Sequence, residues 1–114
     1  MSKFNVLLIR VETILDYHIK ILKTTLSYQQ LADSLGHAPR SRYIATCLGK
    51  LLDEDAKAGQ PLRSASVIHT NEDKQGKKMP GEGFFTQARL SGLSFQDNEL
   101  FWKGEIQKLG IQVK

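Results

Sequence analysis

The sequence predicts a small α+β domain, mainly α-helical, of the helix-turn-helix or winged-helix class, with a small β-hairpin or wing. Three features support this fold. A long amphipathic segment opens the chain, a short helix with a capping sequence follows it, and a glycine-containing turn leads into a longer helix. Because 114 residues can build one compact core but not two, residues 1–114 are expected to form a single winged-helix-like domain.

The first expected element is a long amphipathic helix over residues 4–24. Apolar side chains recur there at steps of three and four residues, which is the repeat of one helical face. The stripe is wide, so this helix is expected to be buried against much of the domain. It consists of Phe4, Leu7, Leu8, Val11, Ile14, Leu15, Ile19 and Leu22.

The helix-turn-helix is expected from Ser27 to about Ala58. Ser27 and Gln30 have the spacing of a capping box, in which each side chain binds a free backbone N–H group at the start of a helix. The first helix of the motif should run from Tyr28 to Leu35 and end at Gly36, because glycine readily adopts the left-handed conformation that closes a helix.

The second helix of the motif is expected from Pro39 to Lys57, after a tight turn at His37-Ala38, with Gly59 and Pro61 ending it. Its buried face is predicted to carry Ile44, Cys47, Leu48 and Leu51. A helical wheel gives the opposite face Arg42, Thr46, Gly49 and Asp53, flanked by Tyr43 and Lys50.

The C-terminal half gives weaker signals. Residues 64–70 are short and β-prone and are predicted to form a strand, and the polar, glycine-rich residues 71–83 are predicted to form a loop. Phe84-Phe85 should return to the core as a second strand or as a helix start. The last helix is expected from Phe95 to Leu109, with Ser94 and Asp97 resembling its cap and Gly110 ending it.

Composition limits the classes of function. The net charge of +4 is compatible with a nucleic-acid partner, although many proteins without one share it. The apolar run Val6–Ile9 is too short to span a membrane and lacks the features of a secretory signal, so a cytoplasmic location is expected. The single cysteine, Cys47, excludes an internal disulfide and a multi-cysteine zinc site.

No enzymatic site, metal site or cofactor is expected. The histidines His18, His37 and His69 lack ligand spacing. Ser66 and His69 would point to opposite faces of a strand, so they do not form a nucleophile and base. A metal-dependent nuclease would need a carboxylate cluster, but the available carboxylates fall in a polar loop, where solvated side chains are commoner; they are Glu72, Asp73 and Glu82.

The second helix of a helix-turn-helix can enter a DNA groove. Arg40 and Arg42 lie near its N-terminus, which is unfavourable for cations and therefore favours a functional role, although they could simply be solvated. The loop lysines could meet phosphates as a wing does, or the segment around Pro80-Gly81 could be a plain surface turn. The predicted DNA-contact residues are Tyr28, Arg40, Arg42, Thr46, Lys50, Lys74, Lys77 and Lys78.

The segment Ser27-Tyr28-Gln29-Gln30-Leu31-Ala32 resembles the DNA-binding half of alkylguanine-DNA alkyltransferases and alkyltransferase-like proteins. The resemblance covers roughly residues 4–50. It implies that Tyr28 lies near the phosphate of the target nucleotide and that Arg42 enters the base stack in place of a flipped base. Residues 65–68 occupy the position of the family's P-C-H-R motif. The reactive cysteine and its histidine are therefore absent, and alkyl transfer is not expected.

Two functions from different classes follow. The first is a non-enzymatic protein that binds double-stranded DNA. The second is a helix-turn-helix scaffold for a protein partner, because the acidic run Asp53-Glu54-Asp55 would repel DNA if it faced the same groove as Arg42. A positive face across Arg42 and the lysine loop would favour DNA, whereas a mixed face with exposed Phe84 or Trp102 would favour a protein. Neither function specifies an oligomeric state.

Overall fold

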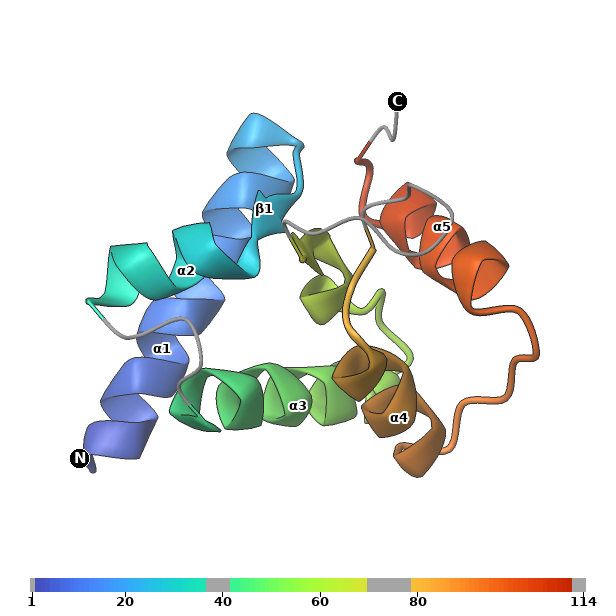
Figure 1. Cartoon of the computed structure of the whole chain (residues 1–114), viewed down its shortest axis with the longest axis horizontal. Helices are drawn as coiled ribbons and strands as arrows, with labels where there is room; N and C mark the ends of the chain where they lie inside the picture. The colour runs from blue at the N-terminus through green and yellow to red at the C-terminus, as the bar shows by residue number, and fades with distance from the viewer. Residues whose placement is uncertain (1, 37–41, 70–78, 112–114) are drawn as a thin grey trace.

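The computed structural model describes residues 2–36, 42–69 and 79–111. The fold is mainly helical, with one small sheet (Figure 1). In chain order the elements are α1 (Lys3–Asp16), the π-helix η1 (Tyr17–Leu22), β1 (Leu26–Ser27), α2 (Tyr28–Leu35), α3 (Arg42–Lys57), the 3-10 helix η2 (Arg63–Ser66), β2 (Val67–Ile68), α4 (Glu82–Leu90) and α5 (Asn98–Lys108).

The short helix η2 lies at the centre of the arrangement. It contacts α1, α3 and α5, while α1 also packs against α2 and α3, and α4 packs on α3. β1 and β2 form a parallel pair in which Leu26 lies beside Val67 and Ser27 beside Ile68. This pair joins the start of α2 to the end of η2, as the centre of Figure 1 shows.

The amphipathic N-terminal helix predicted over residues 4–24 is present, with one difference. Its buried residues Leu7, Val11 and Leu15 continue into Ile19 of η1, so the apolar stripe faces the core as far as Ile19. Leu22, the last residue of the predicted stripe, is exposed. The last six residues are π-helical, and the helix ends at Lys23 in a left-handed conformation with φ 52°. Apolar periodicity does not distinguish a closing π-turn from a continuing α-helix.

The capping box predicted for the helix-turn-helix is confirmed. Ser27 Oγ accepts a hydrogen bond from the Gln30 N–H at 3.0 Å, and Gln30 Oε1 accepts one from the Ser27 N–H at 2.8 Å. Gly36 ends α2 with φ 71°. The predicted end of α3 at Lys57 also holds, whereas its predicted start at Pro39 lies outside the described residues.

The strand predicted over residues 64–70 is wrong for its first half. Residues 64–66 belong to η2, and the strand among the described residues is Val67–Ile68. The Ser66 hydroxyl donates to the Arg63 carbonyl at 2.8 Å, and the Ser64 hydroxyl donates to the Leu48 carbonyl at 2.7 Å. Such side-chain bonds to the backbone compete with extended structure, which explains the tight turn.

The predicted β-hairpin does not form from the described strands, which run parallel. Phe84 and Phe85 lie in a helix, α4, which begins at Glu82, so Gly83 is helical rather than part of a loop. The predicted wing segment at residues 70–78 lies outside the described residues.

The last helix begins later than predicted, at Asn98 rather than Phe95. Asp97 is its N-cap and accepts a hydrogen bond from the Leu100 N–H at 3.0 Å. Phe95 instead stays in the preceding segment, stacked on Phe101 with ring centroids 3.9 Å apart. None of the described helices is long and apolar enough to cross a lipid bilayer.

Candidate nucleic-acid interface

The first two turns of α3 present an open surface. Arg42, Tyr43 and Thr46 are exposed there, whereas Ile44 and Cys47 on the other side of the helix are fully buried. Arg42 and Thr46 are one turn apart on the same face, and the Thr46 hydroxyl donates to the Arg42 carbonyl at 2.8 Å. Packing of the opposite side of α3 therefore leaves this face open to solvent. A helix that enters a DNA groove requires such an open face.

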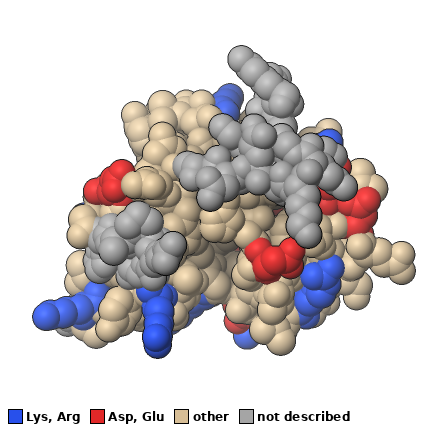
Figure 2. Space-filling model, viewed as in Figure 1, with Lys and Arg blue, Asp and Glu red and all other residues tan. Residues whose placement is uncertain are grey.

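Lys50 extends this positive face toward α1. Its Nζ lies 5.7 Å from the centroid of the Phe4 ring, within the range of a cation–π contact. In Figure 2, blue basic side chains gather at the lower left, where α1 and α3 begin in the view of Figure 1.

The C-terminal half of the predicted outer face of α3 is covered. A Cβ atom on Gly49 would lie 3.4 Å from Gln87 Oε1 of α4, and Asp53 accepts a hydrogen bond from the Ser91 hydroxyl at 2.9 Å. The prediction that Gly49 and Asp53 share the open face with Arg42 is therefore wrong. A helical wheel cannot show which part of a face a later helix covers.

Two of the three carboxylates in the acidic run of α3 have a basic partner, whereas Glu54 is exposed. Asp53 pairs with Lys57 at 2.8 Å, and the hydrogen bonds from Lys57 and Ser91 lower the pKa of Asp53. Asp55 is buried and holds the Arg63 guanidinium. Asp53 lies about 16 Å along the helix from Arg42 at the usual rise per residue. The repulsion that Asp53 and Asp55 would exert on DNA near Arg42 is thereby reduced.

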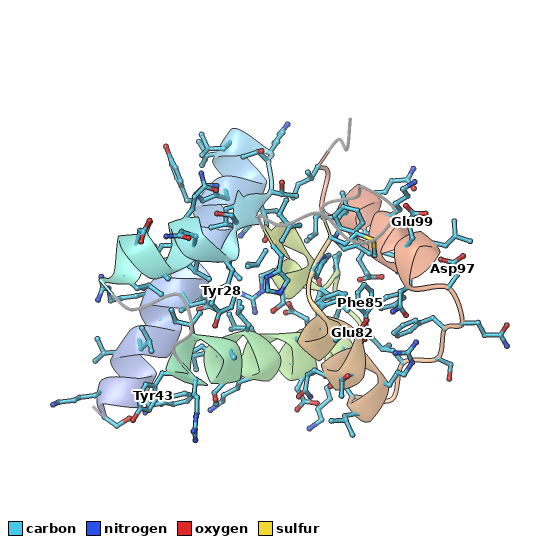
Figure 3. All side chains as sticks on the ribbon, viewed as in Figure 1. Tyr28, Tyr43, Glu82, Phe85, Asp97 and Glu99 are labelled. Atoms are coloured by element: carbon cyan, nitrogen blue, oxygen red, sulfur yellow. The ribbon has the colours of Figure 1, made fainter. Side chains whose placement is uncertain are left out.

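Tyr28 lies inside the fold rather than on its outer surface, as Figure 3 shows by comparison with Tyr43. It is half-buried, and its ring is parallel to that of His69, with an interplanar angle of 14° and centroids 6.2 Å apart. Burial raises the pKa of the Tyr28 phenol, and a hydrogen bond with the Ala45 backbone partly offsets this rise in pKa. Tyr28 therefore links the start of α2 to the first turn of α3.

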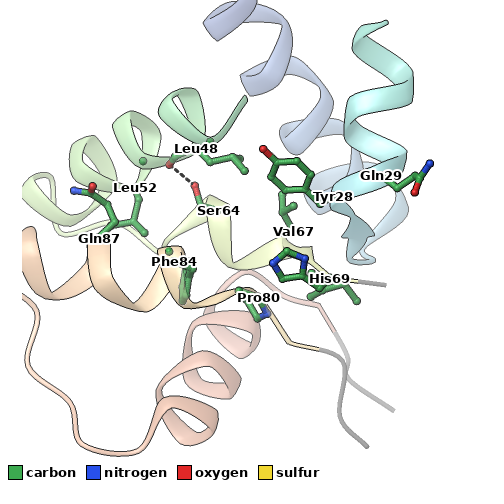
Figure 4. A pocket seen from close by; sticks show the side chains of 15 residues that line it. Tyr28, Gln29, Leu48, Leu52, Ser64, Val67, His69, Pro80, Phe84 and Gln87 are labelled. Carbon is green, nitrogen blue, oxygen red and sulfur yellow. Dashed lines mark hydrogen bonds between the residues drawn. The ribbon is translucent and has the colours of Figure 1, made fainter. Parts of the chain in front are cut away.

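A pocket of about 580 Å³ opens beside Tyr28, between α2, α3, β2 and α4 (Figure 4). Sequence reasoning missed it, because its walls come from four separate parts of the chain. Its described wall is mostly apolar, and the apolar side chains are those of Ala45, Leu48, Leu52, Val67, Ile68, Pro80 and Phe84.

One glycine allows the two sides of the pocket to meet. A Cβ atom on Gly81 would overlap with His69 Nε2, and the His69 N–H donates to the Met79 carbonyl at 3.0 Å. The segment around Pro80-Gly81 therefore folds onto β2, and Pro80 is buried. The plain surface turn considered for this segment does not describe it, and the Pro-Gly pair was the only sequence signal of the close approach.

Contacts between η2 and the surrounding helices hold the base of the pocket in place. Arg63 binds the Asp55 carboxylate of α3 at 3.0 Å and Glu12 of α1 at 2.7 Å. The Trp102 indole N–H of α5 donates to the Ala65 carbonyl at 2.9 Å. Side chains of α1, α3 and α5 thus fix η2, and with it β2.

Four predicted DNA-contact residues lie outside the described residues: Arg40, Lys74, Lys77 and Lys78. The face of the molecule seen in Figures 2 and 3 is mixed in charge, because the acidic Glu82 at the start of α4 lies near its centre. Trp102 is buried and Phe84 is half-buried, so neither is the exposed aromatic expected of a protein-docking face. The mixed charge argues against the positive face expected for DNA. The burial of the two aromatic side chains argues against the exposed face expected for a protein partner.

The described residues also bear on catalysis. Ser66 is fully buried and its hydroxyl is bonded to a backbone carbonyl, whereas His69 is exposed. Within residues 2–36, 42–69 and 79–111, no three histidine, cysteine or acidic side chains converge as a metal site would require.

Comparisons with protein-family models, curated proteins and solved structures gave no match. The resemblance to alkyltransferases accordingly stays a prediction. The function has to be argued from the site itself, since a fold alone does not specify one.

Proposed function

We propose that this chain is a non-enzymatic, winged-helix-type protein that binds double-stranded DNA through the first two turns of α3. The observation that carries the proposal is the arrangement of that helix. Its buried side is anchored in the core, and α4 covers part of its far half, at Gly49 and Asp53. Arg42 and Thr46 stay exposed in the first two turns, and Lys50 is exposed just beyond them. Among the described residues of α3, this end offers a basic, open helix surface for a groove.

Most of the affinity would come from phosphate neutralisation. Arg42 and Lys50 are the described basic side chains of this surface, and the predicted contacts Arg40, Lys74, Lys77 and Lys78 would add to them. Each phosphate contact releases counterions, so binding is expected to weaken steeply as salt rises.

Alkyl transfer has no support. Cys47 is fully buried, and burial raises the pKa of its thiol, so the reactive thiolate is disfavoured. Ala65 and Ser66, which occupy the position of the family's reactive motif, offer no thiol. The activity proposed here is binding alone.

Fluorescence anisotropy with a short labelled duplex at low salt tests the proposal. Arg42→Ala should weaken binding about tenfold, because it removes a charged contact worth on the order of 1–3 kcal/mol. Lys103→Ala on α5 is the matched control: it removes the same charge from a half-exposed side chain on another helix, and should change little. Absence of binding by the parent chain, or equal losses for both variants, would refute the proposal.

One observation favours the alternative, a scaffold for a protein partner. Three apolar side chains of η1 are exposed: Tyr17 by 52%, Ile21 by 67% and Leu22 by 46%. Ile21→Lys separates the two functions. If DNA is the partner, this variant should bind the duplex as well as the parent chain does or slightly better, because it adds a positive charge.

A further inference from the structure

We propose that the pocket between α2, α3, β2 and α4 binds a small, neutral, aromatic molecule carrying one hydrogen-bond donor. This proposal does not depend on DNA binding. The pocket volume of about 580 Å³ falls in the range of small-molecule sites, about 300–1,000 Å³. Its walls belong to elements that the core and η2 hold in place, so the site is largely formed before a ligand arrives.

The wall chemistry selects a neutral ligand. No lysine, arginine, aspartate or glutamate occurs among the described residues that line the pocket. Against the described wall, a charged molecule would lose its hydration without meeting a side chain of opposite charge from those four residue types, which is costly. Apolar side chains such as Leu48, Leu52 and Val67 instead favour burial of apolar surface.

The aromatic side chains favour a flat ring. Tyr28 and His69 lie nearly parallel on one side of the pocket, and Phe84 lies on the α4 side (Figure 4). Aromatic ligands gain from offset stacking and edge contacts with such rings beyond the area that they bury.

One polar group of the described wall, on Gln87, can accept a hydrogen bond from a ligand donor. The Ser64 hydroxyl already donates to the Leu48 carbonyl, and the Gln87 Nε2 group donates to the Ser91 hydroxyl at 3.2 Å. Gln87 Oε1 lies against Gly49 in the pocket wall, where it can accept a hydrogen bond from a ligand N–H or O–H group.

Gly83 provides a way to block the pocket without disturbing the fold. It lies one turn before Gln87 on α4 and lines the pocket, and a Cβ atom there would meet nothing within 4 Å. Gly104 in α5 has the same open space but does not line the pocket, so it is a matched control.

Indole is the probe, because it is neutral and aromatic and has one N–H donor. We expect titration of the full ¹⁵N-labelled chain with indole to give saturable amide shifts concentrated at Gly49, His69 and Gly81. Gly83→Phe should weaken binding at least about tenfold by filling the pocket, and Gly104→Phe should leave it within about twofold. The charged analogue indole-3-acetate and the non-aromatic cyclohexanol should each bind at least about tenfold more weakly than indole.

Three results would overturn the proposal: no saturable shift with the parent chain, shifts centred on the exposed face of η1, or unchanged affinity in Gly83→Phe. The amide spectrum of each variant reports whether it is folded. If Gly83→Phe is not, Ala45→Phe replaces it, because Ala45 lines the pocket from α3 and is exposed. Loss of duplex binding in Arg42→Ala leaves this test unaffected, because Arg42 does not line the pocket.

Discussion

At the scale of single residues, the contact between Gly81 and His69 determines how the pocket closes. The imidazole lies between the Tyr28 ring and the Gly81 backbone, so one side chain contacts both walls. His69 is exposed and can rotate away, and a larger residue at position 81 would therefore displace the ring rather than unfold the chain.

Gly81→Ala should lower the free energy of unfolding by about 0.5–1.5 kcal/mol, the usual worth of an aromatic contact together with mild overpacking. Urea unfolding of this variant, of His69→Ala and of the double variant measures the coupling. In the His69→Ala background the added methyl group should cost almost nothing, because its collision partner is gone. Equal costs in both backgrounds would show that the close approach is not the cause.

Tyr28 leads to a prediction on pH. Burial raises its pKa, so its folded-state value exceeds the unfolded one. The stability that comes from keeping this phenol neutral is present below the unfolded pKa and is lost as pH rises through the folded pKa. In an absorbance titration, Tyr28 should ionise in a late step, above the usual range of a tyrosine phenol. Tyr28→Phe should remove the late step, and a single common step in the parent chain would contradict this account.

At the scale of elements, the features that depend on residues close together in the sequence were predicted correctly. The Ser27 and Gln30 capping box, the glycine at position 36 and the apolar stripe of α1 were all predictable, because each depends on residues within a few positions. The start of α5 was misplaced because both Ser94 and Asp97 can cap a helix, and aromatic packing of Phe95 on Phe101 determines the choice.

Elements that depend on distant partners were not predictable. η2 is a turn rather than a strand because Ser64 bonds to the backbone of α3, sixteen residues away in sequence. The pocket was missed for the same reason, since Tyr28, Leu48 and His69 are far apart in the chain. Arg42 and Thr46 were placed correctly on the open face, whereas the position of Tyr28 inside the fold required the structure.

The ion cluster around η2 leads to a prediction at this scale. Burial alone would lower the pKa of Arg63, but hydrogen bonds with Asp55 and Glu12 raise it above its usual value, so the guanidinium stays charged. Asp55→Ala leaves this charge without its most buried partner and should cost about 3–5 kcal/mol in thermal or urea unfolding. Asp53→Ala, which breaks a surface pair on the same helix, should cost far less. Similar losses for the two variants would contradict the role given to Arg63.

At the scale of the whole molecule, the basic surface proposed for DNA and the neutral pocket proposed for a small molecule lie in different regions. Basic side chains gather where α1 and α3 begin, while the neutral pocket lies between α2 and α4 (Figures 2 and 4). Tyr28, whose ring lines the pocket and whose hydroxyl meets the Ala45 backbone of α3, lies between these two regions. DNA binding and ligand binding can thus be tested separately by Arg42→Ala and Gly83→Phe.

In the proposed function, α3 meets DNA through phosphate contacts at its open end. The most direct measurement is the duplex affinity of the parent chain and of Arg42→Ala across a series of salt concentrations. For the parent chain, the logarithm of the affinity should fall linearly with the logarithm of the salt concentration, by about 0.9 for each phosphate contacted. For Arg42→Ala the slope should be smaller in magnitude by about one. An affinity that does not depend on salt, or identical slopes for the two proteins, would contradict the account.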